Sequence, residues 1–364
     1  MAAPLKDLID RGSVEAVADR FATVDSSFDR AGFVDALWPA IDALELKPRI
    51  AAIATAIHDS LARPYLQALE VVVDVSRAEP HIDGFEAWAL CSFVELYGVD
   101  EPAASLAAME HLTKRSSCEF AIRPFLEQHW DAAFETLHLF AQCEDEAVRR
   151  LPSEGTRPKL PWGTGVRRLL DEPAAGLALL EVLRHDESET VRRSVANHLN
   201  DVAKSNPGLV VETVRRWVSE SPPVDQRMVS HALRTLVKQG NSDALALLGF
   251  TTDAAVEVEA FTVQPSSVEI GGSIELAADI ISTSDDVQRL VVDFVVHHVL
   301  ASGGTSPKVF KWTTLRLEPG ERVELTKRRR IEQASTRTYR SGRHDVELQL
   351  AGRVVRAASF DLVV

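Results

Sequence analysis

This chain of 364 residues has few of the residues on which metal sites and disulfide scaffolds depend. Its three cysteines, Cys91, Cys118 and Cys143, show no CxxC or other metal-ligand spacing, so we expect reduced thiols and no metal. Its eleven histidines show no ligand spacing beyond His297 and His298, which a strand would direct to opposite faces. No HExxH, GxSxG, P-loop or GxGxxG motif occurs, which argues against several common enzyme classes and against a nucleotide or flavin cofactor.

Long apolar runs are also missing. No stretch approaches the eighteen residues of a membrane span, and the N-terminus lacks a basic region followed by an apolar segment. We therefore expect neither membrane association nor secretion, and a place in the cytoplasm, which in a bacterium means the cytosol or nucleoid. Hydrophobic residues make up 45% of the chain, enough for a large core and for two domains.

The charge is acidic overall but unevenly distributed. The formal net charge is −14, which by itself argues against a nucleic-acid partner. Residues 256–364 hold 14 Lys+Arg and 15 Asp+Glu, so 13 of the excess negative charges precede them. Within that segment, residues 308–356 hold 13 basic and 6 acidic residues. This basic region includes the run Lys327, Arg328, Arg329 and Arg330. An acidic total is therefore compatible with a local phosphate-binding surface.

The hydrophobic pattern changes near residue 255. Before it, apolar residues recur at helical spacing, as in residues 33–44 and 177–183. After it the chain alternates, and Gly, Pro and Ser turns separate the alternating runs 256–263, 273–279, 289–299, 322–329 and 345–352. The sequence predicts an all-α domain over 1–252 and an all-β sandwich over 256–364.

The helical part repeats itself. EDEAVRR (144–150) returns as ESETVRR (187–193) after 43 residues, and a weaker copy, DQRMVSHALRTL, spans 225–236. Spacings near 40 are typical of HEAT-type helix pairs stacked into a solenoid, whose concave face usually binds the ligand. The arginines of such repeats have two interpretations: they tie neighbouring repeats together, or they bind a ligand.

One predicted helix, TVRRSVANHLNDVAK, carries an unusual polar face. Its apolar residues Val191, Val195, Leu199 and Val202 form one stripe. The opposite side is expected to carry Arg193, Asn197, Asn200, Asp201 and Lys204. Arginine and asparagine suit phosphate and base-edge contacts, whereas an ordinary solvated helix face is the alternative.

The segment RRLPSEGTRPKLPW (149–162) interrupts the helical pattern with prolines, Gly155 and four basic residues. We expect the prolines and Gly155 to end a helix and to form a rigid loop. The alternative is a plain helix connector whose tryptophan is core and whose charges pair with one another.

Three blocks, EFAIRPFLE (119–127), VRRLPSEGTRPKLPW (148–162) and VRRSVANHLNDVAK (191–204), resemble the AlkC-type DNA alkylation-repair glycosylases of the HEAT-like glycosylase superfamily. An appended immunoglobulin-like domain is known in one branch of that family. The segment 336–352, with Tyr339 before a strand, resembles the tyrosine corner of such a sandwich. The resemblance is densest over 90–220.

The resemblance implies a DNA-3-methyladenine glycosylase of base excision repair. It would hydrolyse the N-glycosidic bond of cationic alkylated bases, chiefly 3-methyladenine and also 3-methylcytosine and 1-methyladenine, without deep base flipping. Such a base leaves readily, so the enzyme needs negative charge beside the oxocarbenium-like sugar and a placed water. We expect the carboxylates Glu119, Glu154 and Asp201, one in each block, to supply both. For Glu119, an ion pair with Arg123 is the alternative.

The same comparison assigns contacts to double-stranded DNA containing alkylated bases. The 149–162 loop would direct Trp162 to the lesion or backbone, where a cationic base gains about 0.5–2 kcal/mol from the indole. The expected DNA-binding residues are Arg123, Arg150, Arg157, Lys159, Arg193, Asn197, Asn200, Lys204 and the four basic residues 327–330. Neither Lys159 nor Lys204 has the apolar setting of a lyase nucleophile, so we expect a monofunctional, cofactor-free monomer.

Two alternatives stay open at this stage. The four basic residues 327–330 also fit an edge strand that charge protects from aggregation. The whole chain also fits a non-catalytic HEAT scaffold that binds protein or DNA, with the β domain as a second binding module. The polar helix face and the proline-rich segment favour the glycosylase, because a scaffold needs neither.

Overall fold

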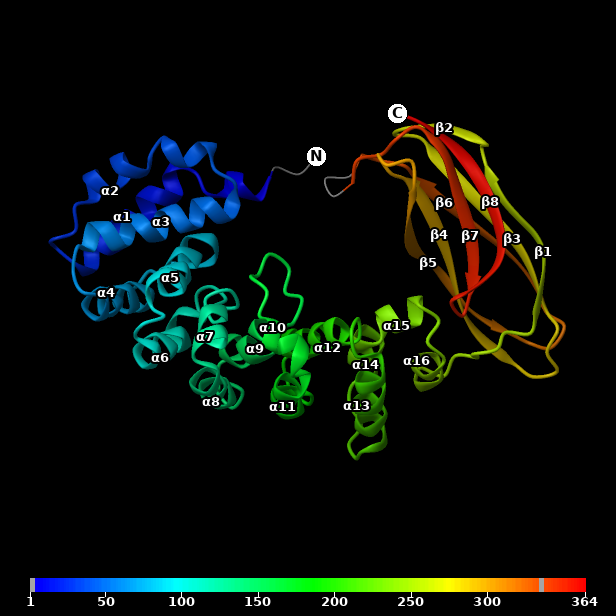
Figure 1. Cartoon of the computed structure of the whole chain (residues 1–364), viewed down its shortest axis with the longest axis horizontal. Helices are drawn as coiled ribbons and strands as arrows, with labels where there is room; N and C mark the ends of the chain where they lie inside the picture. The colour runs from blue at the N-terminus through cyan, green and yellow to red at the C-terminus, as the bar shows by residue number, and fades with distance from the viewer. Residues whose placement is uncertain (1–3, 334–336) are drawn as a thin grey trace. The chain divides into compact units, whose positions relative to one another are not determined.

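The computed structural model describes residues 4–333 and 337–364, in which a helical part precedes a β sandwich (Figure 1). The last helix ends at Leu247 and the first strand begins at Val256. The predicted change from all-α to all-β structure near residue 255 is therefore confirmed. Among these residues no helix is long and apolar enough to cross a membrane.

The helices alternate with short connections along the first part of the chain. They are α1 (Arg11–Val24), α2 (Arg30–Leu37), α3 (Leu46–Leu61), α4 (Tyr65–Arg77), α5 (Gly84–Tyr97), α6 (Pro102–Leu112), α7 (Arg123–Gln128), α8 (Trp130–Phe140), α9 (Glu146–Gly155), α10 (Arg167–Asp171), α11 (Pro173–Leu183), α12 (Glu189–Val202), α13 (Pro207–Ser219), α14 (Gln226–Ala232), α15 (Arg234–Lys238) and α16 (Ser242–Leu247).

The chain divides into two compact units, neither of which is one continuous segment. The first takes in the chain up to Ser205 and then Val224–Ala232, and the second takes in Asn206–Pro223 and Leu233–Val364. Helices α13, α15 and α16 thus belong to the same unit as the strands. Within that unit Gly240 and Gly352 meet at positive φ, and a Cβ on Gly352 would lie 2.1 Å from the Cα of Gly240. No larger residue fits this contact.

The predicted repeat corresponds to successive helices of the first unit. Helix α12 packs against α9 and α14. Arg149 of α9 donates to the carbonyls of Cys143 and Glu144 and pairs with Asp186 at 2.6 Å. Arg192 of α12, 43 residues later, makes the same kind of contacts with the carbonyls of residues 186 and 187. Arg192 also lies 3.9 Å from Asp225 of the next repeat. At these two arginines the interpretation as ties between neighbouring repeats is confirmed.

Helix α12 is buried on more than its apolar stripe. The stripe itself is as predicted, because its four members are at most 1% exposed. Asn200 and Asp201, expected on an accessible polar side opposite that stripe, are only 2% and 1% exposed. That part of the prediction is wrong, because α9, α11 and α14 all pack against α12 and leave it little free surface. Arg193 and Lys204 are exposed and Asn197 is half-buried.

The β sandwich consists of a three-stranded sheet in the order β1-β3-β6 and a five-stranded sheet in the order β2-β8-β7-β4-β5. Its core includes Phe294, Trp312 and Phe360, and Tyr339 packs against it. Thr336, which begins the segment resembling a tyrosine corner, lies outside the described residues. The strands are β1 (Val256–Gln264), β2 (Ser267–Glu269), β3 (Ser273–Ser282), β4 (Gln288–Val299), β5 (Thr305–Leu317), β6 (Arg322–Arg330), β7 (Gly342–Leu350) and β8 (Arg353–Val363).

Strand β6 lies at an edge of the three-stranded sheet and carries the predicted basic run. Exposure alternates along it, so Arg328 and Arg330 are exposed while Lys327 and Arg329 are half-buried. Arg329 stacks on Phe310 at 3.6 Å from the ring centre. The four residues therefore do not form one basic patch, since successive side chains of a strand face opposite ways. Their position fits the protection of an edge strand.

Candidate active site

Helix α9 continues through the first proline of the 149–162 segment. Pro152 lies inside the helix, which ends at Gly155. The prediction that the prolines and Gly155 end a helix is confirmed for Gly155 and wrong for Pro152. Gly155 has a further role. A Cβ there would lie 2.7 Å from Cγ2 of Ile122, so glycine allows α9 to approach the turn before α7. As a result Glu154 lies on a helix rather than in a loop, and it is 4% exposed.

Arg123 holds the loop that follows α9. Its guanidinium donates to the carbonyls of Gly155 at 2.9 Å and Arg157 at 3.1 Å, and to that of Thr164. It is 1% exposed, and burial lowers its pKa to about 10. The prediction that Arg123 binds DNA, and the alternative of an ion pair with Glu119, are therefore corrected. Its donors are used to shape the loop and cannot reach a phosphate.

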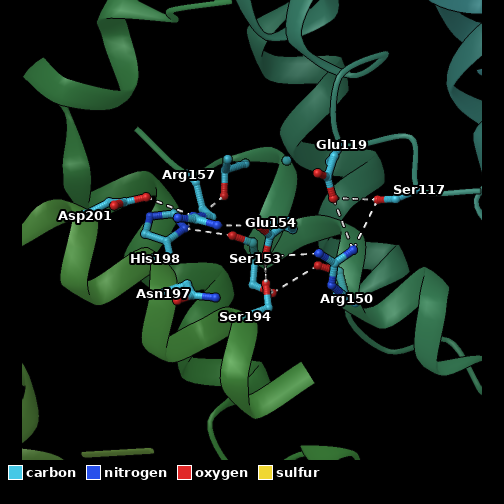
Figure 2. A network of polar contacts seen from close by, with 12 residues as sticks. Ser117, Glu119, Arg150, Ser153, Glu154, Arg157, Ser194, Asn197, His198 and Asp201 are labelled. Atoms are coloured by element: carbon cyan, nitrogen blue, oxygen red, sulfur yellow. Dashed lines mark hydrogen bonds and ion pairs between the residues drawn. The ribbon is translucent and has the colours of Figure 1, made fainter. Parts of the chain in front are cut away.

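The three predicted carboxylates meet in one chain of alternating charges (Figure 2). Arg150 lies between Glu119 and Glu154, with N–O distances of 3.1 and 3.4 Å. Arg157 lies between Glu154 and Asp201, at 2.5 and 2.8 Å. Lys204 ends the chain, 2.8 Å from Asp201. Three anions and three cations therefore fix one another in place.

Arg157 is the buried centre of this network. Burial alone would lower its pKa, but the negative charges of Glu154 and Asp201 outweigh burial and raise it above the ordinary value. At 8% exposure its guanidinium is occupied by the two carboxylates. The prediction that Arg157 contacts phosphates is therefore corrected to a role inside the protein. Arg150, whose side chain is 27% exposed, keeps partial access to solvent.

Neutral groups complete the support beneath Glu154. Ser194 of α12 donates to Oε2 of Glu154 at 2.7 Å and contacts Ser153 at 2.7 Å. His198 is fully buried, and burial lowers its pKa to about 4. Its Nδ1 lies 3.0 Å from the carbonyl of Ser153. Because a carbonyl only accepts, Nδ1 carries the hydrogen of the neutral ring. These contacts hold α9 against α12 below the carboxylates.

A pocket of about 370 Å³ opens beside this network. Glu119, Glu154 and Arg157 contribute to its polar lining. Its aromatic walls are Trp88, Phe120 and Trp162. Asp201 is not part of the lining, so it can act on a bound molecule only through Arg157.

Glu119 is the carboxylate with the most freedom to meet a ligand. Its side chain is 16% exposed, against 6% for Glu154 and 2% for Asp201. Ser117 and Arg150 both contact its Oε2. Oε1 has no hydrogen-bond partner among the residues that the structure describes. One carboxylate oxygen at the pocket is therefore available to a substrate or a water.

Trp162 stands at the rim of the pocket in a fixed conformation. It is 61% exposed and has a φ of +64°, in the left-handed region. Its carbonyl accepts a hydrogen bond of 2.8 Å from Nζ of Lys47 on α3. The same Nζ lies 4.7 Å above the ring of Phe120, which stacks on Trp88 at 5.2 Å. Lys47 thus links the rim to the aromatic wall.

Several of these residues were missed from the sequence. Phe120 and Ser194 lie inside the resembling blocks, next to or near predicted residues, and that proximity was the available signal. Trp88 and Lys47 lie far from the blocks, and no local pattern distinguishes them. Lys159 is exposed, as expected of a phosphate contact. Among residues 4–333 and 337–364, no cluster of three His, Cys, Asp or Glu side chains could hold a metal ion.

Comparisons with known proteins agree with this architecture. Residues 257–364 match the family model of the YhaZ C-terminal immunoglobulin-like domain. The uncharacterized protein YhaZ of Bacillus subtilis is 32% identical over 364 residues, which covers 99% of both chains. A solved structure of the Pseudomonas fluorescens alkylpurine DNA glycosylase AlkC, bound to DNA containing an abasic site analog, is 31% identical, covers 100% of both chains and has a TM-score of 0.93. The chain therefore belongs to the AlkC family of DNA N-glycosylases, with a HEAT-like helical part and a C-terminal immunoglobulin-like domain.

Proposed function

We propose that this glycosylase hydrolyses the N-glycosidic bond of cationic alkylated bases in double-stranded DNA, as a monofunctional enzyme of base excision repair. The main substrate is 3-methyladenine, with 3-methylcytosine and 1-methyladenine as further substrates. One observation carries the proposal: two carboxylates and three aromatic side chains line the same pocket. Aromatic faces attract a cationic base, and carboxylates stabilise the positive charge that moves to the sugar.

The chemistry that we propose needs little acid catalysis. The bond between C1′ and the base nitrogen breaks, and the base leaves as a neutral molecule because it carried a positive charge before cleavage. The positive charge passes to the deoxyribose as an oxocarbenium-like transition state. Water then forms a bond to C1′ and gives up a proton to Oε1 of Glu119, from which the proton passes to solvent. A fixed negative charge close to C1′ lowers the barrier, because it attracts the transition state more strongly than the bound substrate. In the bound substrate the positive charge still lies on the base, farther away.

The proposed roles follow from exposure. Glu119 offers Oε1 to the water or to the sugar, because its other oxygen is occupied by Ser117 and Arg150. Glu154, which is more enclosed, adds negative charge to the pocket lining. Asp201 acts as a positioning residue, because it reaches the site only through Arg157.

The proposed DNA contacts are the exposed cations and the rim. Lys159, Arg193 and Lys204 are exposed, and each would neutralise a phosphate. Trp162 would contact the lesion or the adjacent backbone from the rim of the pocket. The exposed side chains of β6 add a further candidate contact through Arg328 and Arg330. The monomeric state, the cytoplasmic location, the absence of deep base flipping and the limits 1–252 and 256–364 stay predictions.

The test is to incubate the protein with methylated duplex DNA and to identify the free bases. We expect 3-methyladenine to be released far faster than 7-methylguanine. The 3-methyl group lies in the minor groove and the 7-methyl group in the major groove, so the former is nearer an approach from the sugar side. A mock purification from cells that do not express the protein serves as the control for contaminating activity. Comparable release of the two bases would contradict this account of the site.

A further inference from the structure

A second pocket, of about 320 Å³, lies in the β sandwich. It is found where β4 passes into β5 and where residues 337–340 lead into β7. His298, Ser306, Arg337, Thr338 and Arg340 supply its polar lining. Nothing in the proposed glycosylase chemistry uses these residues, which belong to the other compact unit.

His298 is the unusual residue of this pocket. It is 4% exposed, and both ring nitrogens are enclosed without a hydrogen-bond partner among the described residues. Buried polar groups are nearly always hydrogen-bonded, and leaving one unpaired destabilises the fold. The rings of Tyr339 and His344 pack against it in T-shaped arrangements, at centre distances of 5.4 and 5.5 Å. His344 gives it no hydrogen bond and places its own Nε2 3.2 Å from the carbonyl of Arg340.

The charged groups around His298 are basic. Its pKa is lowered to about 3, first by burial and then by Arg337, His344, Arg329 and Lys308. The ring is therefore neutral at pH 7, and it offers one N–H donor. Glu347 does not offset this charge at the pocket, because it pairs with His297, which precedes His298 on β4 and points to the other face.

We propose that this pocket binds a phosphate group, as a monoester or a diester. Arg337 and Arg340 supply the positive charge, the ring N–H of His298 donates from the enclosed side, and Ser306 and Thr338 offer hydroxyl donors. Guanidinium groups suit the planar recognition of phosphate oxygens. The phosphate comes either from the DNA backbone or from a small free compound, and the experiment separates the two sources.

A bound phosphate also changes the titration of His298. The groups that face the ring are Arg337, His344, Arg329, Lys308 and Tyr339. A phosphate among these cations offsets their effect and stabilises the protonated ring, so the pKa of His298 rises on binding. The imidazole resonances of His298, identified by their loss in His298→Phe, should then titrate at a higher pH when phosphate is present.

The experiment measures by calorimetry the affinity of the full chain for inorganic phosphate and for a deoxynucleoside 5′-monophosphate. The variants are Arg337→Gln and His298→Phe, and thermal unfolding verifies that both are folded. Arg337 is half-buried, so its replacement leaves the core unchanged. Arg343→Gln is the matched control, because Arg343 is exposed, pairs with Asp345 and lies outside the pocket. We expect at least a 10-fold loss of phosphate affinity in both variants and none in the control.

A second arm measures duplex binding against salt concentration. A slope lowered by about 1 in Arg337→Gln but not in Arg343→Gln assigns the pocket to a backbone phosphate, with or without measurable binding of the free compounds. Binding of the free compounds with an unchanged slope assigns it to a small phosphate ligand. The proposal is overturned if the slope is unchanged and the wild type either does not bind the free compounds or binds them no better than both variants do. None of these readouts depends on base release, so they also stand if the proposed glycosylase substrates are wrong.

Discussion

Replacing Glu119 by glutamine tests whether the pocket carboxylates stabilise a cation. The amide keeps the size of the side chain and an oxygen for Ser117 but removes the charge. A carboxylate about 4 Å from a unit positive charge gains about 4 kcal/mol at an effective dielectric of about 20. In the bound substrate the same charge lies on the base, about 7 Å away, where the carboxylate already gains roughly 2 kcal/mol. The net effect of about 2 kcal/mol predicts base release about 30-fold slower.

The assay is single-turnover release of 3-methyladenine at saturating enzyme, with DNA affinity measured separately. Affinity should hold or increase in Glu119→Gln, because the lost negative charge repelled phosphates. Glu135→Gln is a suitable control, since Glu135 is an exposed carboxylate of α8 outside the pocket. If the folded Glu119 variant releases the base at the wild-type rate, Glu119 is only an ion-pair partner of Arg150. The catalytic charge would then have to be sought elsewhere.

Four further changes extend the test. Asp201→Asn should slow base release about 10-fold and lower the free energy of unfolding by about 1–3 kcal/mol, as denaturant titration would measure; an unchanged rate would remove its positioning role. Arg328→Glu with Arg330→Glu should weaken duplex binding and flatten its salt slope by about 1–2, and an unaltered slope would leave edge protection as the function of β6. His198 has a folded pKa of about 4 against an ordinary 6.5, so the unfolded chain binds the proton more tightly. The contribution of neutral His198 to the free energy of unfolding is therefore fully present above pH 6.5. It falls by up to about 3 kcal/mol as the pH drops towards 4. His198→Gln should remove that part of the pH dependence in unfolding curves at pH 4.5 and 7.5, and an identical dependence would show that the ring is not its source. Trp162→Ala should slow 3-methyladenine release about 10-fold, consistent with roughly 1–2 kcal/mol of cation–π attraction, without changing affinity for undamaged duplex; equal rates would place the lesion away from the rim.

Local patterns predicted the architecture well because they report on single elements. Helical spacing identified the apolar stripe of α12, and alternation identified five of the eight strands, at 256–263, 273–279, 289–299, 322–329 and 345–352. Strands β2, β5 and β8 were missed. Strand β2 has only three residues, and exposure does not alternate regularly along β5 and β8, so their apolar pattern is weak.

Burial of the site residues could not be predicted in the same way. A helix's own periodicity shows which side is apolar, but not whether neighbouring helices also cover the polar side. Asp201 can be buried because it forms an ion pair with Arg157, which lies in the loop after α9 and 44 residues earlier in the sequence. Arg123 likewise faces carbonyls that come from a later segment. Trp88 lines the pocket and Lys47 contacts its rim only through tertiary packing, so neither residue has a distinguishing spacing in the sequence.

The path of the chain between the two compact units has a consequence for how such a protein can be divided. The backbone passes from one unit to the other after Ser205, after Pro223 and after Ala232. A single cut therefore cannot yield two fragments that each hold one complete unit. A fragment beginning at residue 256 would leave Gly352 without Gly240, and one beginning at residue 206 would carry α14 away from its unit. Exchange of the sandwich between proteins at one recombination point would divide a compact unit in the same way. The last helices and the strands should therefore be inherited together.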